Sequence, residues 1–246
     1  MKVITETELR ELYKKETFTE YKLKYPEKLT PAATQFLNDY KIKIVNVKSL
    51  EKTEDKCVKG GYLIRKNGKT IDKKPEEYTQ IKGNVLVLKN DKRIIFRGKL
   101  DTLEAIFINS IIEIKNSGFT GLCEDLEIIL DFIRNILRAE VLEESLSCFD
   151  YKGLDEAAIR EHSHHPEKYL NTSHFMPETK YGKIMGILNY IRTQIRETEI
   201  ASVDAFIDSQ GENVTRKDIV TALNRLSSLV YLIMCQYKAG YYKSMQ

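Results

Sequence analysis

Apolar residues recur at helical spacing through most of the second half of this 246-residue chain. From Leu100 to Ile114 they recur every three or four positions, which puts them on one face of a helix, and Gly118 ends that stripe. Long helices joined by short connections predict a helical bundle. The expected helices cover about residues 97–117, 122–141, 153–163, 180–208 and 216–239.

The first 47 residues have a different pattern. Thr5 with Glu8 forms a capping box for a short helix, and Thr30 followed by Pro31 predicts the start of a second one. Residues 41–47 then alternate like a strand. The predicted fold is therefore mainly α, a bundle of about five helices with a small N-terminal α/β appendage. The predicted divisions are 1–47 for the appendage, 48–78 for a loop or insertion, and 79–246 for the bundle.

Composition narrows the class of protein. Hydrophobic residues make up 42% of the chain and charged residues 30%, which fits a globular protein with a sizeable core. We expect no membrane span, because no run of 18 apolar residues occurs, and a cytoplasmic protein, because the N-terminus has no continuous apolar stretch. The four widely spaced cysteines form no CxxC pair and are expected to be reduced thiols. They are Cys57, Cys123, Cys148 and Cys235.

The charge is unevenly distributed. Residues 41–99 hold 17 Lys and Arg against 7 Asp and Glu, whereas residues 100–165 hold 5 against 14. Such runs are often solvated faces, but a basic segment also suits a polyanion such as nucleic acid or a nucleoside triphosphate. A nucleic-acid role is disfavoured, because the aromatic residues of the basic segment form no stacking platform.

Polar residues inside apolar helices are the candidates for chemistry. The chain has no Walker A motif, GxGxxG, HExxH or GxSxG. Arg192, Arg196 and Glu199 share one helix face, either as an exposed ladder or as a site. Asn224 interrupts an apolar face of the last helix, either as a polar seam that fixes helix register or as part of a site. Asp101 is expected one turn into the first bundle helix, where its carboxylate could simply interact with the helix dipole.

The four histidines lie within thirteen residues, at His162, His164, His165 and His174. Clustering of this kind invites a metal site, but Pro166 interrupts the spacing and no cysteine lies nearby. Roles in a loop or toward a ligand are favoured over a metal site.

Several segments together resemble the corrinoid adenosyltransferases of ethanolamine utilisation (EutT-type), which are related to the PduO-type enzymes. A Lys-loop-Gly-x-x-Asp segment, an Arg-x-x-x-Arg-x-x-Glu helix and an Asn-Arg-Leu-Ser helix follow one another in the same order between about Thr79 and Ala239. The segments are Lys89–Ala105, Ile136–Glu140, Ser163–Leu170, His174–Pro177, Leu188–Glu199 and Ala222–Ser228.

The resemblance implies transfer of the 5′-deoxyadenosyl group of ATP to cobalt(I) of cobalamin, with Mg²⁺ bridging phosphate oxygens. It implies catalytic roles for Arg192, Asp101 and Arg196, with Arg192 and Asp101 as an ion pair across the bundle. A non-catalytic corrinoid carrier with the same fold is the alternative. The implied ATP-binding residues are Thr79, Lys82, Lys89, Arg196, Glu199 (also a possible Mg²⁺ contact) and Asn224. The implied corrinoid-binding residues are His174, Phe175, Met176 and Arg138.

The chain departs from the resemblance in two places. Some EutT-type enzymes have a His and Cys metal motif before the bundle, but Leu50–Tyr78 holds Cys57 and no histidine, so no protein-bound transition metal is expected. Phe175 lies one position nearer the proline than the aromatic that PduO-type enzymes use to displace the lower corrinoid ligand.

The resemblance also implies partners. These are a corrinoid reductase, an adenosylcobalamin-dependent lyase and further copies of this chain, as a trimer in preference to a dimer. The N-terminal segment is either a small structural cap or a docking segment for a bacterial microcompartment, and in either role the expected chemistry lies beyond Thr79.

Overall fold

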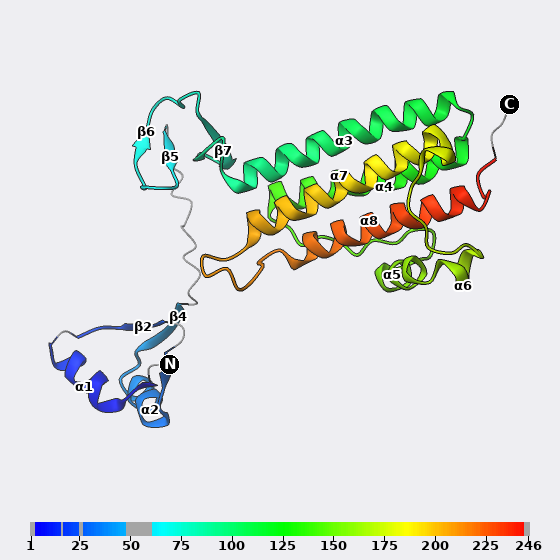
Figure 1. The fold of residues 1–246 in the computed structure, drawn as a ribbon. Coiled ribbons are helices and arrows are strands. Elements are labelled where there is room, and N and C mark those ends of the chain that lie inside the picture. Colours follow the sequence, from blue (N-terminus) through cyan, green and yellow to red (C-terminus); the bar gives the residue numbers. More distant parts are fainter. Residues whose placement is uncertain (1–2, 16, 25–26, 48–60, 244–246) are drawn as a thin grey trace. The chain divides into compact units, whose positions relative to one another are not determined.

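The chain divides into two compact units, Met1–Lys59 and Gly60–Gln246. The computed structural model describes residues 3–15, 17–24, 27–47 and 61–243, and it confirms the mainly α prediction (Figure 1). Each unit has its own apolar core.

The N-terminal unit packs two short helices with two pairs of parallel strands. Its core contains Leu9, Phe36 and Leu37, all at most 3% exposed. Both predicted caps are present, since the Thr5 amide donates to Glu8 Oε2 at 2.8 Å and the Thr30 hydroxyl accepts from a backbone amide. The elements are β1 Val3–Ile4 paired with β3 Lys28–Leu29, β2 Glu20–Lys24 paired with β4 Lys43–Val47, and helices α1 Glu6–Lys15 and α2 Pro31–Asp39.

A small sheet opens the second unit, so of the loop or insertion predicted over 48–78 the loop is wrong. Four strands pair in the order β6-β5-β8-β7, with β5 and β8 parallel. The strands have two to five residues and are separated by tight turns at Gly68 and Gly83, both with positive φ, so no alternation ran long enough to indicate a sheet. The rest of the expected loop, residues 48–60, lies outside the described residues. The strands are β5 Tyr62–Ile64, β6 Thr70–Ile71, β7 Tyr78–Lys82 and β8 Val85–Leu88.

Four long helices form the bundle, as the apolar periodicity predicts (Figure 1). Helix α7 packs against both α3 and α8, α3 also packs against α4, and the short helices α5 and α6 lie on α8. A 3-10 turn, Thr179–Tyr181, leads into α7. The helices are α3 Lys92–Asn116, α4 Thr120–Leu142, α5 Glu156–His164, α6 Pro166–Leu170, α7 Gly182–Phe206 and α8 Lys217–Lys238.

Helix α3 starts earlier than its apolar stripe indicates. The Asp91 carboxylate caps it by accepting from the Arg93 amide at 3.0 Å. Asp101 therefore lies in the third turn of α3. The favourable interaction of a carboxylate with the helix dipole is confined to the first turn, so the expectation that Asp101 stabilises the helix in this way is wrong.

Helix α8 contributes many buried side chains to the bundle core. Leu223, Leu226 and Val230 are fully buried. Among the described helices, α8 alone is long and apolar enough to cross a membrane, yet 61% of the window concerned is buried inside the protein. That burial is what the core helix of a bundle requires.

Candidate functional site

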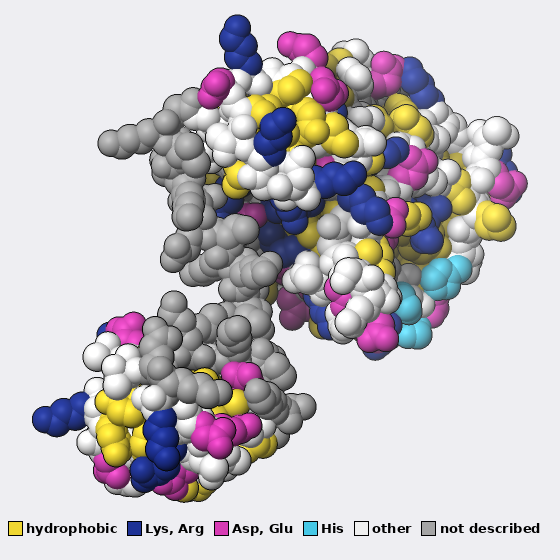
Figure 2. Space-filling view, turned by 90° about the vertical axis from the view of Figure 1, so that its left-hand side faces the viewer, with side chains coloured by type: hydrophobic (Ala, Val, Ile, Leu, Met, Phe, Trp, Pro, Cys, Tyr) yellow, Lys and Arg dark blue, Asp and Glu magenta, His cyan; other side chains and the backbone are white. Residues whose placement is uncertain are grey.

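A groove lies where α7 and α8 meet the segment around α5 and α6. It has a volume of about 270 Å³, and we call it the α7–α8 groove. The histidines of this segment gather in one patch at the edge of the larger unit (Figure 2). The groove is lined by Ser163, His164, His174, Arg192, Arg196, Ser227, Ser228 and Tyr231.

A polar pair joins the two long helices beside the groove. The side-chain amide of Asn224 donates to Glu199 Oε1 at 2.8 Å, and the Arg225 guanidinium donates to Asn224 Oδ1 at 3.2 Å. Both Glu199 and Asn224 are half-buried. The two motifs that the resemblance singled out on separate helices therefore meet in one structure.

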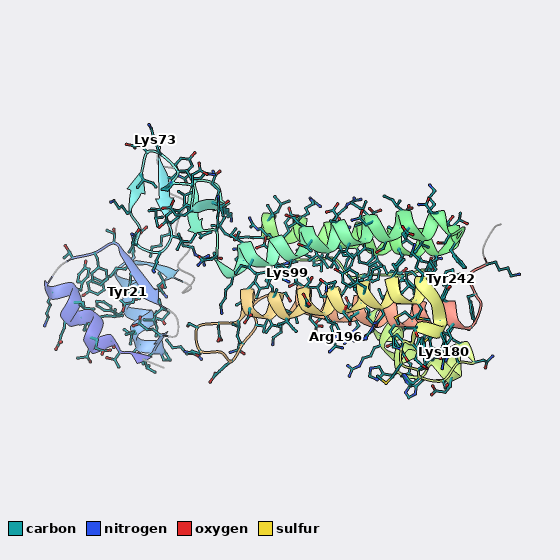
Figure 3. All side chains as sticks on the ribbon, turned by 45° about the horizontal axis from the view of Figure 1, so that its top comes forward. Tyr21, Lys73, Lys99, Lys180, Arg196 and Tyr242 are labelled. Carbon is teal, nitrogen blue, oxygen red and sulfur yellow. The ribbon has the colours of Figure 1, made fainter. Side chains whose placement is uncertain are left out.

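Two arginines of α7, Arg192 and Arg196, line the groove, and their surroundings differ. Arg192 is half-buried, and its guanidinium donates to Asn189 Oδ1 at 3.2 Å. Burial and the nearby charge of Arg196 lower the pKa of Arg192, although a guanidinium keeps its charge in proteins. Arg196 is exposed and has no hydrogen bond or ion pair within the described part of the chain. In Figure 3 it leaves the bundle on the side where α5 and α6 lie. The groove thus holds two cations, and the described residues place no counter-ion beside the outer one.

His174 and Phe175 are bonded to α8 through Tyr231. The His174 ring lies with Nε2 at 2.9 Å from the His164 carbonyl oxygen and Nδ1 at 3.0 Å from the Tyr231 hydroxyl. The Phe175 amide donates to the same hydroxyl at 3.3 Å. Burial raises the pKa of Tyr231, so the hydroxyl keeps its proton at neutral pH.

The neighbours Phe175 and Met176 lie differently. The Phe175 ring packs edge-on against Tyr181 at 5.4 Å and beneath the Lys238 ammonium at 4.3 Å. Met176 is 81% exposed, the largest exposed fraction of any large apolar side chain in the described residues. Phe175 is therefore anchored to the protein, while Met176 is the apolar side chain available to a ligand.

The remaining predicted ATP-binding residues lie at the sheet. Thr79 and Lys82 are on β7, and Lys89 follows β8. Lys82 pairs with Glu143, at the end of α4, at 2.7 Å. None of these residues lines the α7–α8 groove, and Arg196 is the predicted ATP-binding residue that does.

An ionic network beside Lys82 was not predicted from the sequence. The Glu140 carboxylate is fully buried and accepts from Arg93 at 2.6 Å and Arg97 at 2.5 Å. Arg97 also donates to the Ile81 carbonyl at 3.1 Å, and Arg93 to Glu143 at 2.9 Å. The network ties β7 to α3 and α4. The available signal was a pair of arginines four positions apart that precedes the apolar stripe of α3, with a glutamate inside the apolar stripe of α4.

The predicted ion pair of Asp101 with Arg192 is absent from the chain, so that prediction is wrong for a single copy. Asp101 lies on the exposed face of α3, whereas Arg192 faces the groove beside Tyr231. Arg138 also lies outside the groove, exposed on α4 and 3.5 Å from Glu144. Among the residues that the structure describes, no group of three or more His, Cys, Asp or Glu is placed to hold a metal ion.

The comparisons with known proteins identify the family. Residues 70–237 match the cobalamin adenosyltransferase family, and residues 3–49 match the corrinoid adenosyltransferase EutT N-terminal domain. The chain belongs to the cobalamin adenosyltransferase family.

Relatives and solved structures agree with this assignment. The chain is 37% identical over 164 residues to the corrinoid adenosyltransferases EutT of Escherichia coli K12 and Salmonella typhimurium LT2. Those matches span 67% of this chain and 60% of each relative's length. A variant of the PduO-type ATP:corrinoid adenosyltransferase of Lactobacillus reuteri, solved with cobalamin and ATP, has the same bundle fold. Its TM-score is 0.51 at 19% identity, over 69% of this chain and 93% of that one.

Proposed function

We propose that this protein transfers the 5′-deoxyadenosyl group of ATP to the reduced cobalt of a corrinoid, giving adenosylcobalamin and triphosphate. The observation that carries the proposal is the α7–α8 groove, which brings Arg192 and Arg196 together with His174, while the Glu199–Asn224 pair joins the same two helices. The family, its relatives' names and the corrinoid- and ATP-bound fold neighbour support it.

The nucleotide half of the reaction is assigned to α7. Cobalt(I) supplies the electron pair for the new cobalt–carbon bond, the bond between C5′ and the triphosphate oxygen breaks, and triphosphate leaves with the electrons of that bond. Cations aimed at the leaving group stabilise the charge that develops there. Arg196, whose charge has no partner in the described chain, is suited to this task. Glu199 and Asn224 would orient the nucleotide or a Mg²⁺ ion on its phosphates.

The corrinoid half is assigned to the segment on α5, α6 and the following turn. Loss of the lower axial ligand makes cobalt(II) easier to reduce, so an apolar wall under the ring favours the chemistry. We assign that wall to Met176, whose 81% exposure a corrin ring would reduce, with Phe175 as its anchored support. His174 lines the same groove.

Completion of the site by a second copy is part of the proposal. Thr79, Lys82 and Lys89 lie at the sheet, away from the groove residues, and Asp101 is exposed without an ion pair in the described chain. A homo-oligomer, a trimer in preference to a dimer, would let the sheet of one copy supply lysines to the groove of the next. It would also let Asp101 meet an Arg192 of another copy.

The proposed partners follow from the reaction. A corrinoid reductase must supply cobalt(I), and an adenosylcobalamin-dependent lyase of ethanolamine utilisation would consume the product. We place the protein in the cytoplasm, with the N-terminal unit as a docking segment for a microcompartment.

An anaerobic absorption experiment tests the function. Chemically reduced cob(I)alamin with ATP, Mg²⁺ and the protein should convert to the spectrum of adenosylcobalamin, and omission of ATP should prevent the change. A corrinoid carrier, which has no need of an unpaired Arg196, would bind the corrinoid without conversion. Binding without conversion would therefore contradict the proposal and favour the carrier.

A further inference from the structure

Tyr231 of α8 holds the segment to which corrinoid binding is assigned, although no predicted role included it. Its ring lies nearly parallel to the His174 ring at 5.8 Å between centroids, and to the Phe175 ring at 6.0 Å. Its hydroxyl is within hydrogen-bond distance of both His174 Nδ1 and the Phe175 amide. One side chain thus contacts two consecutive residues of a connecting segment that has no helix or strand of its own from Ser173 to Glu178.

The partners fix which atom donates in each bond. The His164 carbonyl can only accept, so His174 Nε2 carries a proton. In the neutral ring Nδ1 is then an acceptor, and Tyr231 donates its hydroxyl proton to it while its oxygen accepts from the Phe175 amide. The hydrogen bonds run as one chain, from Phe175 through Tyr231 and His174 to the end of α5. Removal of a single oxygen atom would break the chain at its centre.

The Tyr231 ring also borders the groove that Arg192 and Arg196 enter. Tyr231 therefore lies between the two arginines of the groove and the segment that carries Met176. Since the fixed geometry of neighbouring groups governs how well a site orients reactants, displacement of this segment should affect the corrinoid more than the nucleotide.

We infer that Tyr231 is a positioning residue, which fixes the His174–Met176 segment on α8 and so sets the apolar wall beneath the corrin ring. This inference rests on the proposed function for the identity of the ligand, but the anchoring itself requires no ligand. Tyr231→Phe removes the hydroxyl and keeps the ring. Tyr237→Phe is the matched control, because Tyr237 is a half-buried tyrosine of the same helix that packs edge-on against Phe119 and donates no hydrogen bond in the described residues.

The first measurement is hydrogen–deuterium exchange of the ligand-free, full-length protein. The peptide that covers residues 171–177 should exchange roughly three- to tenfold faster in Tyr231→Phe, the factor expected for the loss of a net hydrogen bond, and at the wild-type rate in Tyr237→Phe. Exchange that is equal in the two variants would overturn the anchoring.

The second measurement is the electron paramagnetic resonance spectrum of cob(II)alamin bound with ATP. In the wild type, the nitrogen coupling from the lower ligand should disappear. In Tyr231→Phe, part of it should remain, with a raised KM for cobalamin and an unchanged KM for ATP. Coupling that persists in the wild type would overturn the apolar wall and with it the positioning role, whereas the proposed function is tested separately by the conversion of cob(I)alamin with ATP. Faster exchange together with a wild-type cobalt spectrum and KM would overturn the positioning role alone.

Discussion

Arg192 and Arg196 lie one helical turn apart and differ in what surrounds their charge. The inner guanidinium is half-buried and donates to Asn189, whereas the outer one is exposed and has no bond in the described chain. A charge that repels a neighbouring cation and has no oppositely charged partner in the described chain is available to a ligand. This difference separates a binding role from a structural role at two residues of the same type.

Replacement of Arg196 should therefore affect function without affecting stability. Arg196→Ala is expected to leave the melting temperature within about a degree of wild type, because exposed changes without a partner are nearly neutral. Turnover with ATP should fall on the order of a hundredfold or more, the usual effect of removing one charge-stabilising donor. Thermal melting and initial rates at saturating corrinoid measure the two quantities. Arg134→Ala, at an exposed position of α4, is the control for charge loss, and equal turnover in both variants would contradict the assignment.

The sequence indicated most of the groove residues individually but not their contacts. Arg192, Arg196, Glu199 and Asn224 stand out because polar groups interrupt apolar helix faces, and the structure confirms that Glu199 and Asn224 meet. Whether Asp101 and Arg192 lie in contact could not be predicted from the sequence. Periodicity shows which face of its own helix a residue occupies, but it does not show how two helices are oriented relative to each other.

At the scale of elements, the buried Glu140 carboxylate joins α3, α4 and β7. Arg93 and Arg97 neutralise it, and Arg97 continues to a backbone carbonyl of β7. A buried ion group of this kind contributes little net stability when intact, but loss of one member leaves charge uncompensated. The small sheet that carries Lys82 is thereby fixed to the bundle.

Removal of that carboxylate should destabilise the fold strongly. Glu140→Ala is expected to lower the free energy of unfolding by about 3–5 kcal/mol, because it leaves the half-buried Arg97 guanidinium without its counter-ion and leaves Arg93 with Glu143 alone. Glu144→Ala, at the exposed end of α4, should change it by about 0–1 kcal/mol. Urea denaturation followed by circular dichroism measures both. Similar losses for the two variants would show that the network has no special role.

Glu143 gives the same end of α4 a dependence on pH. Hydrogen bonds from Lys82 and then Arg93 hold the pKa of Glu143 below its ordinary value of 4.5. A carboxyl with a lowered folded pKa stabilises the protein above its unfolded pKa, and the contribution disappears as pH falls through the folded value.

The wild type should therefore exceed Glu143→Gln in unfolding free energy at pH 7, by about 0–1 kcal/mol for a partly exposed group, and the difference should shrink as the pH falls below 4.5. Denaturation of both proteins at a series of pH values tests this. A difference that grows on acidification would contradict the sign.

Element boundaries show how far sequence reasoning reaches. The long helices of the bundle were predicted to within a few residues, because each buries a continuous apolar stripe. The start of α3 was missed, since its first turn is capped by Asp91 and carries the arginines of the network in place of the stripe. The strands of the small sheet were missed because none exceeds five residues.

At the scale of the whole molecule, the division into two units has a consequence for function. The N-terminal unit has its own core around Leu9 and Phe36, and every groove residue lies in the second unit. The chemistry should therefore depend on residues 60–246 alone.

A truncated protein that begins at Gly60 should retain the melting transition of the bundle and adenosylate cob(I)alamin at a rate within about twofold of the full chain, since a compact unit with its own core can fold separately. Calorimetry and the same rate assay measure the two properties. A truncated protein that folds but has lost turnover would place part of the site in the N-terminal unit.

The central claim, adenosyl transfer from ATP to cobalt at the α7–α8 groove, is tested most directly by the products of one anaerobic reaction. Cob(I)alamin, ATP and Mg²⁺ are incubated with wild type and with Arg196→Ala, and corrinoids and phosphates are separated by liquid chromatography. The account predicts adenosylcobalamin and inorganic triphosphate in equal amounts with wild type, and little of either with the variant. Diphosphate or monophosphate without adenosylcobalamin, or equal yields from the two proteins, would contradict it.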